Sequence, residues 1–267
     1  MKKGILVYTK QDASVNKWFI SHISGELKKF GAELELFILD KQAELPSDID
    51  FCINRSRYYK VNEAYDKKGI PCFNNEKTVK TANDKWLTYL LCKELGIPVM
   101  KTEIFSGGYD VNYPFVLKSR NGHGGSEVEL IENNNQLGGD KLCNPSGYIA
   151  QEKCSDVGVD VRVYTLGGRI VAAVKRTSDV DFRSNFSLGG KVELFTPEKE
   201  QIDAITKLQT ILNTDYAGFD FIRHEGRWVL NEIEDAVGAR MLYSLCDTDI
   251  VGDYAKYIAE RIRLIKC

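Results

Sequence analysis

The 267-residue chain lacks the features that mark several large classes of protein. Its net charge is only −2, so no basic excess favours binding to nucleic acid. No apolar run approaches the length of a membrane-spanning helix. The N-terminus has two lysines but only a short apolar stretch, which indicates a buried first strand and not a signal peptide. We therefore expect a cytoplasmic protein that binds neither nucleic acid nor membranes.

Cysteine and histidine are few and scattered. The seven cysteines include no C-x-x-C pair, and the three histidines lie far apart in the sequence. Zinc sites usually need closely spaced ligands of these types, so no zinc site is predicted. The odd number of cysteines indicates reduced thiols, most of them serving as small core residues.

The first 80 residues alternate between strand and helix patterns. Apolar, β-prone segments are followed by helical spacing that ends at Gly31 and at Gly69. The predicted strands are 5–8, 34–39, 51–53 and 70–73. This alternation predicts a parallel sheet with helical crossovers. No G-x-G-x-x-G motif follows the first strand, which argues against a dinucleotide site there.

A strong helix pattern near residue 81 marks a boundary in the chain. Thr81 is expected to cap the helix, with Asp84 in its first turn. Its apolar stripe is Leu87, Leu90, Leu91 and Leu95. Gly96 and the nearby Pro98 end it. We therefore predict an N-terminal domain over residues 1–80 and a second domain over residues 81–267.

The second domain changes to antiparallel β patterns. It is expected to contain a central lobe, residues 81–150, and a C-terminal lobe, residues 151–267. Strands are expected at 113–118, 127–131, 148–153, 161–166, 169–175 and in a hairpin over 219–234, with helices at 197–212 and 249–265. The pair Gly167-Gly168 predicts a two-residue turn, which would set Leu166 opposite Arg169.

Three carboxylates in the 219–234 hairpin are candidate metal ligands, because hard cations prefer oxygen. They are Asp220, Glu232 and Glu234. Side chains alternate between faces of a strand, so the loop length decides whether these acids meet. A loop of residues 224–226 sets Asp220 opposite Leu230 and on the same face as Glu232. A loop of residues 225–226 alone would turn the glutamates away. We predict the longer loop.

Several short motifs in a fixed order resemble the ATP-grasp superfamily, most of all the RimK-like carboxylate–amine ligases. They are Asp84-Lys85, Val116-Leu117-Lys118, Gln151-Glu152, Asp160-Val161-Arg162, Phe182-Arg183-Ser184-Asn185, Gly218-Phe219-Asp220 and Asn231-Glu232-Ile233-Glu234. The resemblance covers roughly residues 81–240. It implies an α/β N-terminal lobe with a parallel sheet, followed by a two-lobed α+β ATP-grasp fold that holds ATP between its lobes.

The resemblance also implies roles in nucleotide binding. Lys85 and Lys118 would reach the phosphates, and Lys118 and Arg183 would be catalytic, since cations stabilise a transferring phosphoryl group. The other nucleotide-binding residues would be Gly124, Gly125 and Ser126 of a glycine-rich lid, Glu152, Lys153 and Cys154 along the adenine, and Ser184 and Asn185 beside Arg183. Asp160 would accept the ribose hydroxyls; the alternative is a salt bridge with Lys175 across the ladder.

Metal and substrate roles follow from the same resemblance. Asp220, Glu232 and Glu234 would bind Mg²⁺ or Mn²⁺, although RimK-like enzymes commonly have Asn where this chain has Glu234. Arg162 and Arg240 would bind substrate; Arg240 could equally pair with Asp235.

The implied activity is that of an ATP-dependent ligase that forms an amide or peptide bond through an acyl phosphate, giving ADP and phosphate. Its partners would be small carboxylates and amines, amino acids or a peptide among them, and a homo-oligomer is compatible with the sequence. The alternatives are an ATP-grasp kinase and a nucleotide-binding regulator without catalysis. The polar segment 54–57 is interpreted as a loop, with an anion contact as its alternative.

Overall fold

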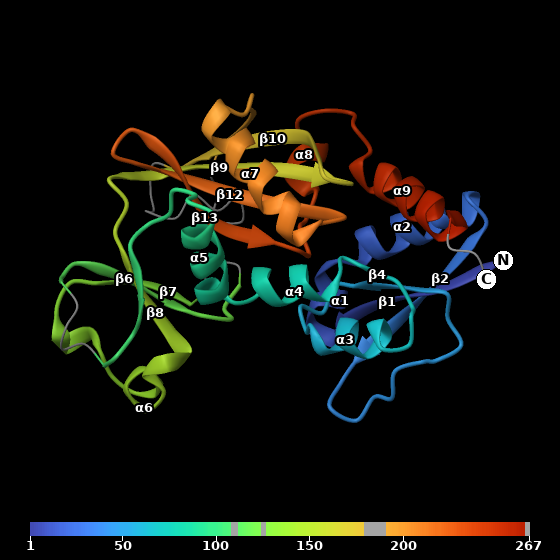
Figure 1. Ribbon diagram of the computed structural model, residues 1–267, viewed down its shortest axis with the longest axis horizontal. Coiled ribbons are helices and arrows are strands. Elements are labelled where there is room, and N and C mark those ends of the chain that lie inside the picture. The colour runs from blue at the N-terminus through green and yellow to red at the C-terminus, as the bar shows by residue number, and fades with distance from the viewer. Residues whose placement is uncertain (108–111, 124–126, 179–190, 265–267) are drawn as a thin grey trace.

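The computed structural model describes residues 1–107, 112–123, 127–178 and 191–264, which form three β-sheets with helices packed against them (Figure 1). Among the described helices, none combines the length and apolar character needed to span a bilayer. The cysteines in these ranges carry free thiols. The three sheets follow one another along the chain, so each can be described in sequence order.

The N-terminal sheet is parallel, as predicted, with strand order β2-β1-β3-β4. Its elements are β1 (Lys2–Thr9), α1 (Lys10–Val15), α2 (Lys17–Lys29), β2 (Ala32–Leu39), β3 (Phe51–Asn54), α3 (Lys60–Asp66) and β4 (Cys72–Phe73). In β1, Leu6 and Tyr8 join one core cluster, whereas Ile5 and Val7 join another on the opposite face. Both faces of the strand are covered, which explains its continuous apolar sequence.

The boundary helix differs from the prediction. The chain forms two helices there, α4 (Glu76–Ala82) and α5 (Lys85–Glu94). Asp84, and not Thr81, caps α5, because its carboxylate accepts the N–H of Trp86 at 2.9 Å. The predicted apolar stripe is also partly wrong: Leu90 is 44% exposed, while Thr88 and Cys92 are buried.

The central sheet is antiparallel, with strand order β5-β8-β6-β7. Its elements are β5 (Thr102–Ile104), β6 (Phe115–Ser119), β7 (Val128–Ile131), a 3₁₀ turn (Asn134–Gln136), α6 (Asp140–Cys143), a second 3₁₀ turn (Pro145–Gly147) and β8 (Tyr148–Glu152). Phe115, Leu117 and Ala150 lie in the core on one face. Lys118 therefore lies on the other face, because side chains alternate along a strand.

The C-terminal sheet has the strand order β11-β10-β9-β12-β13 and is antiparallel. Its strands are β9 (Asp156–Leu166), β10 (Arg169–Thr177), β11 (Lys191–Leu194), β12 (Tyr216–His224) and β13 (Arg227–Glu234). Helix α7 (Lys199–Leu212) covers one face, where Leu208 shares a core cluster with Val163 and Phe219. The short α8 (Arg240–Tyr243) and the long α9 (Ile250–Leu264) end the described chain.

The β9–β10 hairpin turns as predicted, but its register shifts farther along. Gly167 and Gly168 have positive φ, and Leu166 lies opposite Arg169. A β-bulge between residues 170 and 172 then moves the pairing by one residue. Asp160 consequently lies opposite Arg176, and not opposite Lys175.

The β12–β13 hairpin has the shorter loop, so the predicted three-residue loop is wrong. His224 pairs with Arg227 across Glu225 and Gly226, both of which have positive φ. The predicted pairing of Asp220 with Leu230 is wrong too: Asp220 pairs with Glu232. A β-bulge in β13 adds the extra residue that the shorter loop does not have. Asp220, Glu232 and Glu234 therefore still lie on one face of the sheet.

The last helix returns to the N-terminal sheet. Helix α9 packs against α2, on the same side of the molecule as the N-terminus (Figure 1). Ile23 of α2 and Ile258 of α9 belong to one core cluster. The division into domains at residue 80 remains a prediction, since this core joins residues from both sides of it.

Candidate active site

A row of charged side chains crosses one face of the C-terminal sheet. Arg176 on β10 lies opposite Asp160 on β9, and two residues along β9 Arg162 lies opposite Asp220 of β12. Glu232 of β13 follows, because it pairs with Asp220. The opposite face is apolar and lies against α7. The alternation of strand side chains thus gathers charges from four strands on the face away from α7.

Three acids on this face, Asp160, Asp220 and Glu234, are bound by arginines. Arg162 donates from Nε and Nη2 to the two carboxylate oxygens of Asp220 at 2.7 and 2.6 Å. Arg162 also contacts Glu234 at 2.6 Å, and Arg176 contacts Asp220 at 2.9 Å. Arg176 Nε donates to Asp160. The alternative pairing of Asp160 with Lys175 is not made; Lys175 binds Glu193 at 2.9 Å.

The acids respond differently to this environment. Burial alone would raise the pKa of Asp220, but Arg162 and Arg176 together hold it well below its usual range. The pKa of Glu234 is raised, because burial and the neighbouring acids outweigh the attraction of Arg162. Asp220 is therefore firmly ionised, whereas a cation beside Glu234 would favour its ionised form.

Two lysines approach this row from the central part of the chain. Lys118 of β6 donates from Nζ to Oδ1 of Asn231 at 2.8 Å. Lys85, the first residue of α5, donates to the carbonyl of Gly122 and lies 3.1 Å from a carboxylate oxygen of Glu232. Burial lowers the pKa of Lys118 to about 8. Lys85 and Lys118 thus contact Glu232 and Asn231 of β13, and their roles in phosphate binding remain predictions.

A pocket lies between the two lysines and the neighbouring elements. It is lined by Lys85, Thr88, Tyr89, Val99, Lys118, Ile149, Gln151, Leu230 and Asn231. Beside this pocket a backbone hydrogen bond joins β13 to the segment before β5, because the N–H of Leu230 donates to the carbonyl of Pro98 at 2.9 Å. Lys85 and Lys118 therefore share this pocket with Asn231, the neighbour of the predicted metal ligand Glu232.

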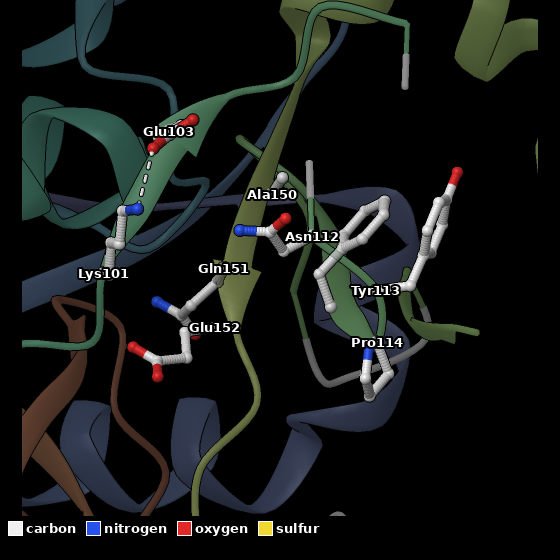
Figure 2. Close-up of a pocket in the computed structure, with 9 residues that line it drawn as sticks. Lys101, Glu103, Asn112, Tyr113, Pro114, Ala150, Gln151 and Glu152 are labelled. Atoms are coloured by element: carbon white, nitrogen blue, oxygen red, sulfur yellow. Dashed lines mark ion pairs between the residues drawn. The ribbon is translucent and has the colours of Figure 1, made fainter. Parts of the chain in front are cut away.

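The predicted adenine segment begins at the end of β8. A second pocket, shown in Figure 2, surrounds Glu152 with Lys101, Glu103 and Tyr113. Strand alternation puts the Glu152 side chain on the face of Phe115 and Ala150, opposite that of Lys118. Its backbone N–H donates to the carbonyl of Lys101 at 2.9 Å. The Glu152 side chain therefore lies on the sheet face away from Lys118, and the contacts of Glu152, Lys153 and Cys154 with adenine remain predictions.

Six predicted nucleotide-binding residues lie outside the described residues. They are Gly124, Gly125 and Ser126 of the glycine-rich lid, and Arg183, Ser184 and Asn185. Their roles remain predictions.

The two predicted substrate arginines have other contacts in this structure. Arg162 is buried against Asp220 and Glu234. Arg240 donates to the carbonyl of Val15 at 3.3 Å, and its alternative partner Asp235 instead accepts from Nδ2 of Asn83 at 2.9 Å. A role for either arginine in substrate binding remains a prediction.

The predicted metal ligands are not gathered tightly around one point. Among the described residues, the group of three that brings ligand atoms within 4.8 Å of one another is His22, Glu26 and Asp249. Asp249 there accepts from His22 at 2.9 Å and from the N–H of Gly252 in α9 at 2.9 Å. This group is explained as the contact between α2 and α9. The acids at positions 220, 232 and 234 share a face but are held by arginine and lysine.

Two residues of the site escaped the sequence analysis. Arg176 neutralises Asp160 and Asp220, and Asn231 holds Lys118. Arg176 could have been found from strand alternation only with the bulge in β10 known. Asn231 sat inside a recognised motif, but its role depends on the bulge in β13.

Known proteins resemble the chain over most of its length. The model of the RimK-like ATP-grasp domain matches residues 82–258. An uncharacterized protein of Mycoplasma pneumoniae is 32% identical over 250 residues, which cover 92% of this chain and 88% of that protein. A probable alpha-L-glutamate ligase of Haemophilus influenzae is 28% identical over 212 residues, covering 74% and 70%. The D-alanine–D-alanine ligase of Bacillus anthracis superposes with a TM-score of 0.74 at 15% identity, covering 98% and 99%. This last likeness shows the fold and confirms the predicted fold class.

Proposed function

The chain belongs to the RimK-like ATP-grasp family, and on this basis we propose that it is an ATP- and magnesium-dependent carboxylate–amine ligase. In the proposed reaction a substrate carboxylate accepts the γ-phosphoryl group of ATP, and ADP leaves. An amine then attacks the acyl phosphate, so that an amide forms and phosphate leaves. The observation that carries the proposal is that Lys85 and Lys118 face the acidic row of the C-terminal sheet.

The two lysines would hold the triphosphate. Lys118 is buried and bound to a neutral amide oxygen, so a phosphate oxygen would meet a cation that carboxylate contacts do not already saturate. Lys85 would release Glu232 toward a metal ion as it turns to the phosphates. The lid residues and Arg183 would complete the phosphate site and exclude water from the acyl phosphate.

The acids would hold magnesium or manganese. Their donor set is all oxygen, as hard cations require, and Asp220 and Glu232 are adjacent across the ladder. Asp220 and Glu232 would hold Mg²⁺, which would supply positive charge to offset that of the phosphates. Glu234 adds a third negative charge to the set, and Arg162 offsets this charge with a contact at 2.6 Å. The set would therefore hold a cation once Arg162 and Arg176 release the carboxylates of Asp220 and Glu234.

The remaining predicted contacts concern the nucleoside and the substrates. Asp160 would accept a ribose hydroxyl while Arg176 orients its carboxylate. Lys153 and Cys154 would lie along the adenine. The name of the Haemophilus relative supports L-glutamate as the first substrate to test. Small carboxylates and peptides would be tested as its partner.

The direct test measures ADP release with defined substrates. We expect turnover only when ATP, Mg²⁺, a carboxylate and an amine are all present, and mass spectrometry should detect the amide. Glu232→Gln should lower turnover about 100-fold, whereas Glu193→Gln, an exposed ion-paired acid, should not. ADP release without any amine would instead identify a kinase. Binding of Mg·ATP without any turnover would identify a regulator.

A further inference from the structure

The end of β3 and the loop that follows it form a hydrogen-bonded turn of buried polar residues. Oδ1 of Asn54 accepts from the N–H and the hydroxyl of Ser56 at 3.0 and 2.7 Å. Nδ2 of Asn54 donates to the carbonyl of Tyr58 and to Oδ1 of Asn62. Asn54, Arg55 and Ser56 are all less than 8% exposed. Arg57 follows this buried group.

The guanidinium of Arg57 uses few of its hydrogen-bond donors within the described part of the chain. Its backbone has φ = 64°, which costs free energy for a residue with a side chain and recurs at functional sites. Its Nη1 lies 2.9 Å from Oδ2 of Asp12, and the side chain is 29% exposed. Asp12 is its one hydrogen-bond partner among the described residues. Guanidinium has five N–H donors, so several remain for an anion.

Asp235 is an acid whose carboxylate, like the guanidinium of Arg57, has only part of its hydrogen bonds made within the described residues. It is 5% exposed and directly follows Glu234 of the acidic row. Its Oδ1 accepts from Nδ2 of Asn83 at 2.9 Å, while its buried Oδ2 has no donor within the described part of the chain. A buried carboxylate oxygen without a donor is costly, and most such oxygens are paired. Oδ2 is therefore suited to a donor that arrives with a ligand.

The segments that carry the two residues are joined by hydrogen bonds beside the proposed ATP site. Nη2 of Arg55 donates to the carbonyls of Ala236 and Val237 at 2.8 and 2.9 Å, so the turn that carries Arg57 is bound to the segment that follows Asp235. Asn83, the partner of Asp235, is two residues before Lys85.

We propose that Arg57 and Asp235 form a binding subsite for an α-amino acid, with the α-carboxylate on Arg57 and the α-ammonium on Asp235. Arg57 offers further hydrogen-bond donors and Asp235 a further acceptor, and the two residues lie on neighbouring segments. Their opposite charges match the two charges of a zwitterion. The subsite rests on the proposed ligase function, since it supplies the amino-acid substrate. It also assigns a role to the 54–57 segment.

Three probes separate the two contacts by calorimetry. L-glutamate has both groups, N-acetyl-L-glutamate lacks the ammonium, and γ-aminobutyrate lacks the α-carboxylate. Each is titrated into the full chain with Mg²⁺ and a non-hydrolysable ATP analogue. Asp235→Asn should weaken L-glutamate binding about tenfold or more and leave N-acetyl-L-glutamate unchanged. Arg57→Gln should weaken L-glutamate similarly and leave γ-aminobutyrate unchanged. Arg169→Gln, an exposed arginine at the β9–β10 turn, is the matched control.

The subsite is overturned if both variants bind L-glutamate as the wild type does, or if they weaken all three probes equally. If the wild type does not bind L-glutamate, the other standard amino acids are titrated, and binding of none also overturns it. Failure of the ligase proposal looks different: the amino acid binds through Arg57 and Asp235, yet no substrate combination releases ADP. ADP release that is insensitive to both variants would retain the ligase and remove the subsite. Thermal unfolding confirms that each variant is folded.

Discussion

Lys118 is a buried cation whose direct partner is a neutral side chain. Its Nζ donates to Oδ1 of Asn231, whereas Arg162 and Arg176 bind carboxylates. Burial therefore lowers the pKa of Lys118 to about 8. A lysine that is half protonated near pH 8 makes anion binding depend on pH.

Nucleotide affinity should fall as the pH rises through 8. The protonated lysine binds phosphate, so above pH 8 binding must first return a proton to Lys118. The dissociation constant for ATP should then increase up to about tenfold per pH unit. Calorimetry between pH 7 and pH 9.5 measures this slope. Lys118→Arg keeps its charge over that range, and its affinity should stay nearly constant.

The Lys118→Arg variant also shows which result would contradict this prediction. A similar slope in the wild type and in Lys118→Arg would show that another group, and not Lys118, sets the pH dependence.

At the scale of single elements, the β12–β13 hairpin decides where the acids point. Its loop is Glu225-Gly226, and both residues have positive φ, which is the pattern of a type I′ turn. Asn-Gly is strongly preferred in such turns, while glutamate is strained at the first position. The sequence therefore gives little signal for the turn that forms.

Replacing Glu225 with a better turn residue should stabilise the protein. Glu225→Asn should raise the free energy of unfolding by about 0.5–1 kcal/mol, because Asn tolerates positive φ. Gly226→Ala should lower it, since φ is 75° there. Denaturant unfolding of the two variants and the wild type measures both effects. Equal stabilities would contradict the turn geometry.

The same hairpin shows what sequence can and cannot predict. Alternation and turn signals identified both strands, and the order of motifs identified the family. The loop length and the bulge were not visible, because two-residue and three-residue loops suit the same apolar pattern. The prediction that Asp220 and Glu232 share a face held only because the bulge corrected the wrong loop.

Two candidate capping residues close together explain why the start of α5 was predicted wrongly. Thr81 and Asp84 are both good capping residues, and sequence alone could not decide between them. Arg120 contacts Asp84 at 2.6 Å and comes from a segment thirty-six residues away. Such a long-range contact is not visible in a local pattern, so the break between α4 and α5 could not be predicted.

At the scale of the whole molecule, one buried asparagine joins the N-terminal sheet to the C-terminal sheet. Oδ1 of Asn74 accepts from the N–H groups of Asp215 and Tyr216 at 2.6 and 3.0 Å. Its Nδ2 donates to the carbonyls of Tyr216 and Asp235 at 2.8 and 3.0 Å. Asn74 thus fixes the start of β12 and the residue that follows β13.

Removing the Asn74 side chain should destabilise the protein and disturb the proposed amino-acid subsite. Asn74→Ala leaves four buried backbone groups without their partner and should cost about 2–4 kcal/mol of unfolding free energy. Asn133→Ala, at an exposed cap of a 3₁₀ turn, should cost about 1 kcal/mol or less. Denaturant unfolding compares the two. Because Asn74 holds the backbone of Asp235, L-glutamate should also bind more weakly to Asn74→Ala under conditions where that variant is folded. A cost no larger than that of Asn133→Ala would show that the sheets are held together by their shared apolar core and not by this asparagine.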